Sequence, residues 1–275
     1  MATISKSLTV AAKSAYSLTI NVIPTGSSIT PANDIQIWLH CADIWDKTYT
    51  TISQVLADAS TLFALISSNN AADYMARSTN WASSVCANQT AMGYIGNNDY
   101  CANKLLANST WLNAICNSTY MESVLNVKVP TMTSATAPSG VVTQSSTYSG
   151  AGYMAFDGND TTGWVPTYVG SKADYSDWLG YEFTSNVLIK CVKLLVDSGS
   201  FNVSACKYKL QQYNGSTWID VGSAGTISQN AQIKNYTLPC SGGNKLKKYR
   251  VIFDSLYVSG QYQAYIRTMQ LYGRA

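Results

Sequence analysis

Apolar residues recur at a fixed spacing between residues 31 and 130, and this period constrains how the first half of the chain can fold. In blocks of twenty starting at residue 31, the fifth and fifteenth positions are all apolar. These positions are Ile35, Val55, Met75, Ile95 and Ile115, and Trp45, Leu65, Val85, Leu105 and Leu125. Clusters of Ser, Thr, Asn and Asp separate the apolar segments, and such side chains accept hydrogen bonds from the free amides of a helix's first turn. The sequence predicts helices of about two turns, paired into twenty-residue hairpins.

A helix of about two turns is not stable alone in water, because helix nucleation is unfavourable. The predicted helices must therefore stack on one another, as a small solenoid or a zigzag bundle. We interpret residues 31–130 as a spacer or oligomerisation stalk rather than a ligand site, and His40 as part of the packed scaffold. The pattern resembles the short helical repeats of phage tail or fibre proteins over residues 50–125.

The rest of the chain divides by composition. Residues 1–30 alternate in hydropathy around a Pro-Thr-Gly turn and predict an N-terminal β arm. Residues 131–142 are rich in Pro, Ser, Thr and Gly, which is typical of a linker. From residue 143 to 275, short alternating segments and the Asn214-Gly215 turn signal predict an antiparallel β-sandwich. We interpret the basic run from Lys245 to Arg250 as a solvated edge strand.

Three landmarks in this second half occur in a recognisable order. They are Ala155-Phe-Asp-Gly-Asn-Asp-Thr-Thr-Gly-Trp164, Tyr208-Lys-Leu-Gln-Gln-Tyr-Asn-Gly-Ser-Thr-Trp-Ile-Asp220 and Ile266-Arg-Thr-Met-Gln-Leu-Tyr-Gly273. Residues 143–275 thereby resemble the discoidin or coagulation factor C-type domain, a galactose-binding-like jelly roll. The resemblance implies a domain that recognises something displayed on a surface.

The resemblance also implies a structural calcium ion near the Asp-Gly loop. Asp157, Asp160 and Thr162 match the positions of its oxygen ligands, and Ca²⁺ prefers oxygen ligands. Thr268 stands where the family usually has a glutamate, which weakens the expected site. The alternative is that Asp157 only shapes the turn.

In the family that the second half resembles, ligands bind to loops at one end of the sandwich. The matching segments here are 166–175, 197–202 and 255–262, and they are rich in Tyr, Asn, Gln and Ser. Tyrosine offers a flat apolar face to a sugar ring and a hydroxyl for hydrogen bonding. The expected ligand-binding residues are Tyr168, Lys172, Tyr175, Asn202, Tyr257 and Tyr262. Trp164 and Trp178 are expected to support the core instead.

Composition excludes several classes of function. The net charge of +3 without a clustered basic stripe argues against nucleic acid, and no apolar run is long enough for membrane insertion. Seven cysteines without a CxxC pair, with one histidine, do not suggest zinc. We favour free, buried thiols for these cysteines, and disulfide bonds are the alternative. No signal peptide is evident. No catalytic motif is evident either, so we expect a protein that is not an enzyme.

These observations lead to a first hypothesis and to alternatives. The first is a phage virion protein, of tail or fibre type, that attaches through its first half, forms homo-oligomers and presents a sandwich to cell-surface glycans. The second is a structural decoration or assembly protein whose sandwich contacts other virion proteins. A secreted adhesin would need an export route that the sequence does not show.

Overall fold

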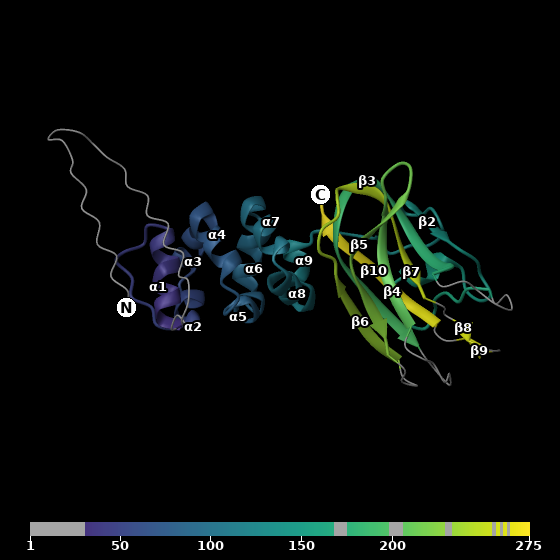
Figure 1. The fold of residues 1–275 in the computed structure, drawn as a ribbon, viewed down its shortest axis with the longest axis horizontal. Helices are drawn as coiled ribbons and strands as arrows, with labels where there is room; N and C mark the ends of the chain where they lie inside the picture. The colour runs from purple at the N-terminus through teal and green to yellow at the C-terminus, as the bar shows by residue number, and fades with distance from the viewer. Residues whose placement is uncertain are drawn as a thin grey trace. The chain divides into compact units, whose positions relative to one another are not determined.

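The structure is a computed structural model that combines an array of short helices with a β-sandwich (Figure 1). It describes residues 31–167, 175–197, 206–228, 233–254 and 265–275, and the backbone of 257–258 and 261–262. The predicted N-terminal β arm, residues 1–30, lies outside the described residues. The predicted fold class of the part that is described, short helices followed by an antiparallel sandwich, is confirmed.

The helices of the array are six to eleven residues long, apart from two shorter ones. They are α1 (Pro31–Cys41), α2 (Ile52–Ala57), α3 (Ala59–Ser67), α4 (Asn69–Arg77), α5 (Ala82–Cys86), α6 (Gln89–Gly96), α7 (Asp99–Ala107), α8 (Ser109–Asn117) and α9 (Met121–Val124). Among the helices in the described residues, none combines the length and hydropathy that crossing a membrane requires.

Single residues form several of the corners between these helices. Ser68 ends α3 and begins α4, and Asn108 does the same between α7 and α8. Each has an extended backbone conformation, and its side chain accepts a hydrogen bond from an amide of the next helix. One extended residue turns the chain sharply while its side chain caps the following helix. The predicted polar clusters thus mark the corners.

The helices stack with a period that differs from the predicted pairing. A helix packs on the one that follows three places later in the chain. As a result, α4 lies between α1 and α7, α5 between α2 and α8, and α6 between α3 and α9. One turn of the array is therefore thirty residues, as from Asn69 to Asp99, and the predicted twenty-residue hairpin is wrong. The burial pattern repeats every ten residues, once for each helix. A period of twenty in the sequence is a multiple of this repeat, so it does not show how many helices make one turn of the array.

Polar side chains at the corners also join successive turns of the array. The Ser68 hydroxyl donates to the carbonyl of Cys41 at 3.1 Å, the Asn98 amide to Ile66 at 2.9 Å, and the Ser118 hydroxyl to Cys86. Each acceptor lies at or next to the end of a helix in the preceding turn. Carbonyls at helix ends have no partner within their own helix, so these bonds satisfy them.

The sandwich is built around one long strand that belongs to both of its layers. Its elements are β1 (Val127–Lys128), β2 (Val141–Gln144), the 3-10 helix η1 (Gly152–Phe156), β3 (Asp177–Asp197), β4 (Cys206–Tyr213), β5 (Trp218–Ile227), β6 (Ile233–Pro239), β7 (Leu246–Phe253), β8 (Tyr257–Val258), β9 (Gln261–Tyr262) and β10 (Tyr265–Arg274). The first half of β3 pairs with β2 and β7, and its second half pairs with β6 and β10. The first layer continues from β7 to β4 and β5.

Two segments of the sandwich lie elsewhere than the sequence suggests. The basic run of Lys245 to Arg250 was expected on an edge, but β7 lies between β3 and β4, so the edge interpretation is wrong. Met132, within the predicted linker 131–142, is buried in the core of the sandwich, and β2 begins at Val141. The chain therefore contacts the sandwich core before residue 143.

The last strand joins the sandwich to the helices. The Arg274 guanidinium donates to the carbonyl of Val124 at 2.6 Å and of Gly96 at 3.1 Å, at the ends of α9 and α6, and contacts the Asp99 carboxylate at 2.5 Å. Gly96 leaves no room for a side chain, since a Cβ there would stand 1.8 Å from the Ser123 carbonyl oxygen. Cys116 of α8 and Cys191 of β3 are buried in the same cluster.

Candidate functional site

Strand ends from both layers meet at one end of the sandwich. Asp177 pairs with Phe253, and Asp197 pairs with Tyr265. Cys206 lies beside them, with its thiol donating to the Asp254 carbonyl at 3.5 Å. We call this end, defined by Asp177, Asp197, Cys206, Phe253 and Tyr265, the distal rim.

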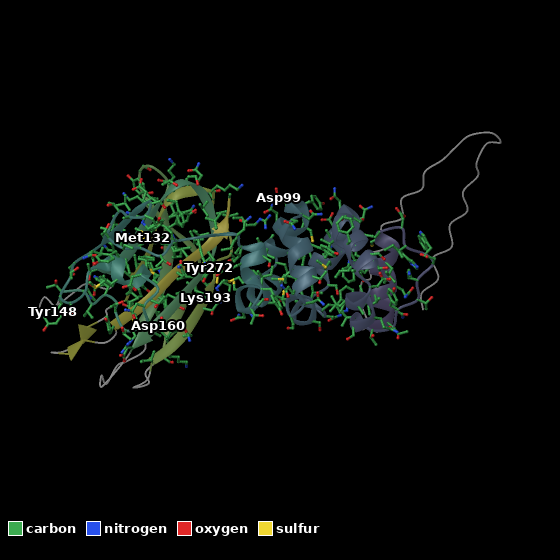
Figure 2. All side chains as sticks on the ribbon, turned by 180° about the vertical axis from the view of Figure 1, so that it is seen from behind. Asp99, Met132, Tyr148, Asp160, Lys193 and Tyr272 are labelled. Carbon is green, nitrogen blue, oxygen red and sulfur yellow. The ribbon has the colours of Figure 1, made fainter. Side chains whose placement is uncertain are left out.

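Trp164 connects the two layers at the distal rim. Its backbone bridges Ile266 of β10, while its ring lies 6.4 Å from that of Phe253 in β7. The indole nitrogen donates to the Ser146 carbonyl at 2.7 Å, and the side chain is fully buried. Trp164 therefore supports the core, as expected. Figure 2 shows Asp160 and Tyr148 at this end, away from the helices, and Lys193 and Tyr272 closer to them.

The distal rim receives the flanks of all three segments that the sequence marks as ligand loops. Segment 166–175 leads into Asp177, 197–202 leaves from Asp197, and 255–262 lies between Phe253 and Tyr265. Tyr168, Lys172 and Asn202 lie outside the described residues. Tyr257 and Tyr262 are paired across the β8–β9 ladder, which brings their backbones together. Ligand binding by these residues stays a prediction.

Tyr175 is the one expected ligand residue whose side chain is described. Its backbone has a φ of 60°, a left-handed conformation that is uncommon for a residue other than glycine. Its ring lies under the Lys209 ammonium, 4.6 Å from the ring centroid. Tyr175 therefore faces β4, next to the outer surface of the first layer.

Hydrogen bonds within the Asp-Gly loop and from β10 hold the loop in place. The Thr162 hydroxyl donates to the Asp157 carboxylate at 2.6 Å, and the Thr268 hydroxyl donates to the Asp160 carboxylate at 2.9 Å. The Arg267 guanidinium donates to the Asp160 carbonyl at 2.7 Å. Thr268, where the resemblance implies a glutamate, therefore contacts the loop.

These residues fit a calcium ion poorly. Arg267 places a cation at the Asp160 carbonyl, where Ca²⁺ would need a free oxygen. The same guanidinium pairs with the Asp197 carboxylate at 2.5 Å, so the charge of that acid is already compensated. Within the described ranges, no three His, Cys, Asp or Glu side chains gather as a metal site. The arrangement favours Asp157 as a residue that shapes the turn, and calcium stays a prediction.

Two side chains differ from what the sequence suggested. Trp178, expected in the core, lies partly exposed on the outer face of β3, 5.4 Å from the Arg250 guanidinium carbon. Tyr148, which was not singled out, is 62% exposed at the distal rim. Alternation gives a signal for Trp178, because Leu179 and Tyr181 point into the core and Trp178 must point the other way.

Among known structures, several carbohydrate-binding domains are similar in fold. One is the family 32 carbohydrate-binding module of Clostridium perfringens NanJ in complex with galactose, 18% identical, with a TM-score of 0.37, covering 48% of this chain and 93% of that one. A second is chitosan-binding module 2 of a Paenibacillus chitosanase/glucanase with chitotriose, 22% identical, with a TM-score of 0.35, covering 49% and 96%.

A third similar structure is another family 32 module from Clostridium perfringens, in complex with GalNAc-β-1,3-galactose. It is 19% identical, with a TM-score of 0.38, and the match covers 48% of this chain and 94% of that one. Comparison with models of protein families and with curated proteins finds no match. The similarity thus concerns about half of the chain and its fold.

Proposed function

We propose that the sandwich binds carbohydrate through the segments whose flanks meet at the distal rim, and that the protein is not an enzyme. The observation that carries this proposal is the convergence of the flanks of 166–175, 197–202 and 255–262 at one end of the fold. Thirteen of the nineteen tyrosines lie in residues 131–275. Tyrosine-rich segments that start from rigid strands can stack on a sugar at little cost in ordering entropy.

A glycan array probed with the full chain tests this proposal. We expect binding to a restricted set of glycans, and we expect the combined change of Tyr168, Tyr175, Tyr257 and Tyr262 to Ala to abolish it. Tyr100→Ala is the matched control, since Tyr100 is an exposed tyrosine on α7 of the helical array. No signal from the full chain, or equal signals from both variants, would contradict the proposal.

We further propose that the protein acts on a phage particle, attached through the helical array and presenting the sandwich outward. Low charge, at 12% of residues, and the order of array and sandwich favour this role. Individual glycan contacts are weak, and several copies on one particle would raise the overall affinity. Immunogold labelling of purified particles tests it, with label on tails or fibres expected; unlabelled particles would refute it.

The alternative is a structural role in which the protein decorates or assembles a virion through protein contacts. Trp45 and Phe63 favour this alternative, because they are 68% and 56% exposed on the helical array and provide apolar contact points. The tyrosine variant distinguishes the two roles. Intact particles that fail to adsorb support glycan binding, whereas failed assembly supports the structural role.

A further inference from the structure

The outer face of the first layer carries a cation held between two indole rings. The Arg250 guanidinium carbon lies 4.2 Å from the centroid of the Trp218 ring and 5.4 Å from that of Trp178. The Tyr213 ring lies 5.4 Å from the Trp218 ring. All four side chains are partly exposed. We call Trp178, Tyr213, Trp218 and Arg250 the aromatic–arginine face.

Strand alternation places these side chains together. Tyr249 and Val251 of β7 are buried in the core, so Arg250 between them points outward. Arg250 is paired with Gly180 on β3 and with Gln211 on β4, so its direct partner on β3 has no side chain and the β3 contact comes from Trp178. Gly180 lets the strands approach closely here, since a Cβ at this position would stand 3.1 Å from the Arg250 Cβ.

Two lysines near Arg250 on this face are paired with acids. Lys209 contacts the Asp220 carboxylate at 3.1 Å, and Lys248 contacts the Glu182 carboxylate at 3.5 Å. Asp254 lies close enough to raise the pKa of Lys209, although the hydrogen bond from Lys209 to Asp220 raises it more. Each acid on this face therefore has a lysine nearby.

Arg250 differs from these lysines, because no carboxylate contacts it in the part of the chain that the structure describes. Its Nε atom donates to the Gln211 side-chain oxygen at 2.9 Å, and Gln211 in turn donates to Asp220 at 2.8 Å. The two terminal amino groups make no hydrogen bond to a described residue. Partial burial lowers the pKa of Arg250, because burial disfavours the charged form.

A guanidinium with both terminal amino groups available is suited to a planar acid. It can donate two parallel hydrogen bonds to one carboxylate, which a lysine cannot do. The exposed Trp218 and Tyr213 rings beside it can stack on the apolar face of a sugar ring. We infer that the aromatic–arginine face binds a glycan that carries carboxylates, through Arg250 and the Trp218 ring. This surface lies on the outer face of the first layer and not on the segments between the strand ends, so it goes beyond the proposed function.

Polygalacturonate and its fully methyl-esterified form test this inference, because the two polymers differ in whether the carboxylate is free. In affinity electrophoresis of the full chain, we expect retardation by polygalacturonate and not by the ester. Arg250→Gln should weaken the retardation at least tenfold, and Arg250→Lys should weaken it less, since charge is kept and the paired donors are lost. Lys234→Gln is the matched control, because it removes one exposed positive charge from β6.

Several outcomes would overturn the inference. They are no binding of polygalacturonate, equal binding of the ester, equal loss in Lys234→Gln, or binding of a sulfated polymer alone. Far-ultraviolet circular dichroism and urea unfolding establish that each variant is folded, and Trp218→Ala gives a second variant that should lose binding if Arg250→Gln is unstable. Substitution of Tyr257 and Tyr262 should leave uronate binding intact, so failure at the rim and failure at this face can be told apart.

Discussion

Arg274 shows how one side chain can stabilise two helices and a strand. It is 5% exposed, and its guanidinium satisfies the terminal carbonyls of α6 and α9. Arg274→Met should lower the free energy of unfolding by about 2–4 kcal/mol, because buried acceptors lose their donor. Urea unfolding followed by tryptophan fluorescence measures this loss.

The matched control for Arg274 is Asp99→Asn. The Asp99 side chain is 89% exposed, so solvent screens its contact with the guanidinium and the change should have little effect. A loss in Asp99→Asn as large as that in Arg274→Met would show that the ion pair rather than the carbonyl contacts stabilises the junction, and no loss in Arg274→Met would show that neither does.

Asn98 joins helices of successive turns of the array. Its side-chain oxygen caps α7 by accepting from the Cys101 amide at 3.0 Å, while its amide donates to the Ile66 carbonyl in the preceding turn. Asn98→Asp keeps the cap and removes the donor, so we expect a loss of about 1 kcal/mol in unfolding free energy. Asn108→Asp should cost nothing, because Asn108 acts only as an acceptor in the described contacts of α8. Equal effects in both variants would argue against a bond between turns.

The Asp-Gly loop gives a prediction about metal removal. Because Thr162, Thr268 and Arg267 already contact the loop's acceptors, treatment with EDTA should leave the Tm unchanged. Thermal unfolding with and without added Ca²⁺ measures this. A rise in Tm with Ca²⁺ that disappears in Asp157→Asn would show that the ion binds there after all.

The stability of the whole molecule should fall at alkaline pH. Burial raises the pKa of Cys86, Cys101 and Cys206 to about 12, from 9.0 for a free thiol. Between these values the unfolded chain loses protons that the folded chain keeps, so stability is full below pH 9 and is lost as the pH rises toward 12. Each thiol contributes up to about 1.4 kcal/mol per pH unit in that range. Urea midpoints at pH 7 and pH 10.5 test this, and Cys101→Ala should reduce the difference; equal midpoints would contradict it.

The sequence predicts local features of this molecule better than distant ones. Polar clusters such as Asn97-Asn98-Asp99 mark the helix starts, because a cap and its helix are neighbours in the chain. The number of helices per turn follows from corner angles, which composition does not encode. The central place of β7 depends on partners far away in the sequence, β3 and β4, so Arg250 could not be placed between Trp178 and Trp218 beforehand.

The one-residue corners mean that the number of helices in the array determines the orientation of the sandwich as well as its distance from the first helix. With three helices to each thirty-residue turn, one extra ten-residue helix would rotate everything after it by about a third of a revolution. A full extra turn of three helices would move the sandwich along the axis of the array and leave its orientation unchanged. Insertion of a single helix would therefore turn the sandwich to face another direction without altering any residue of the sandwich.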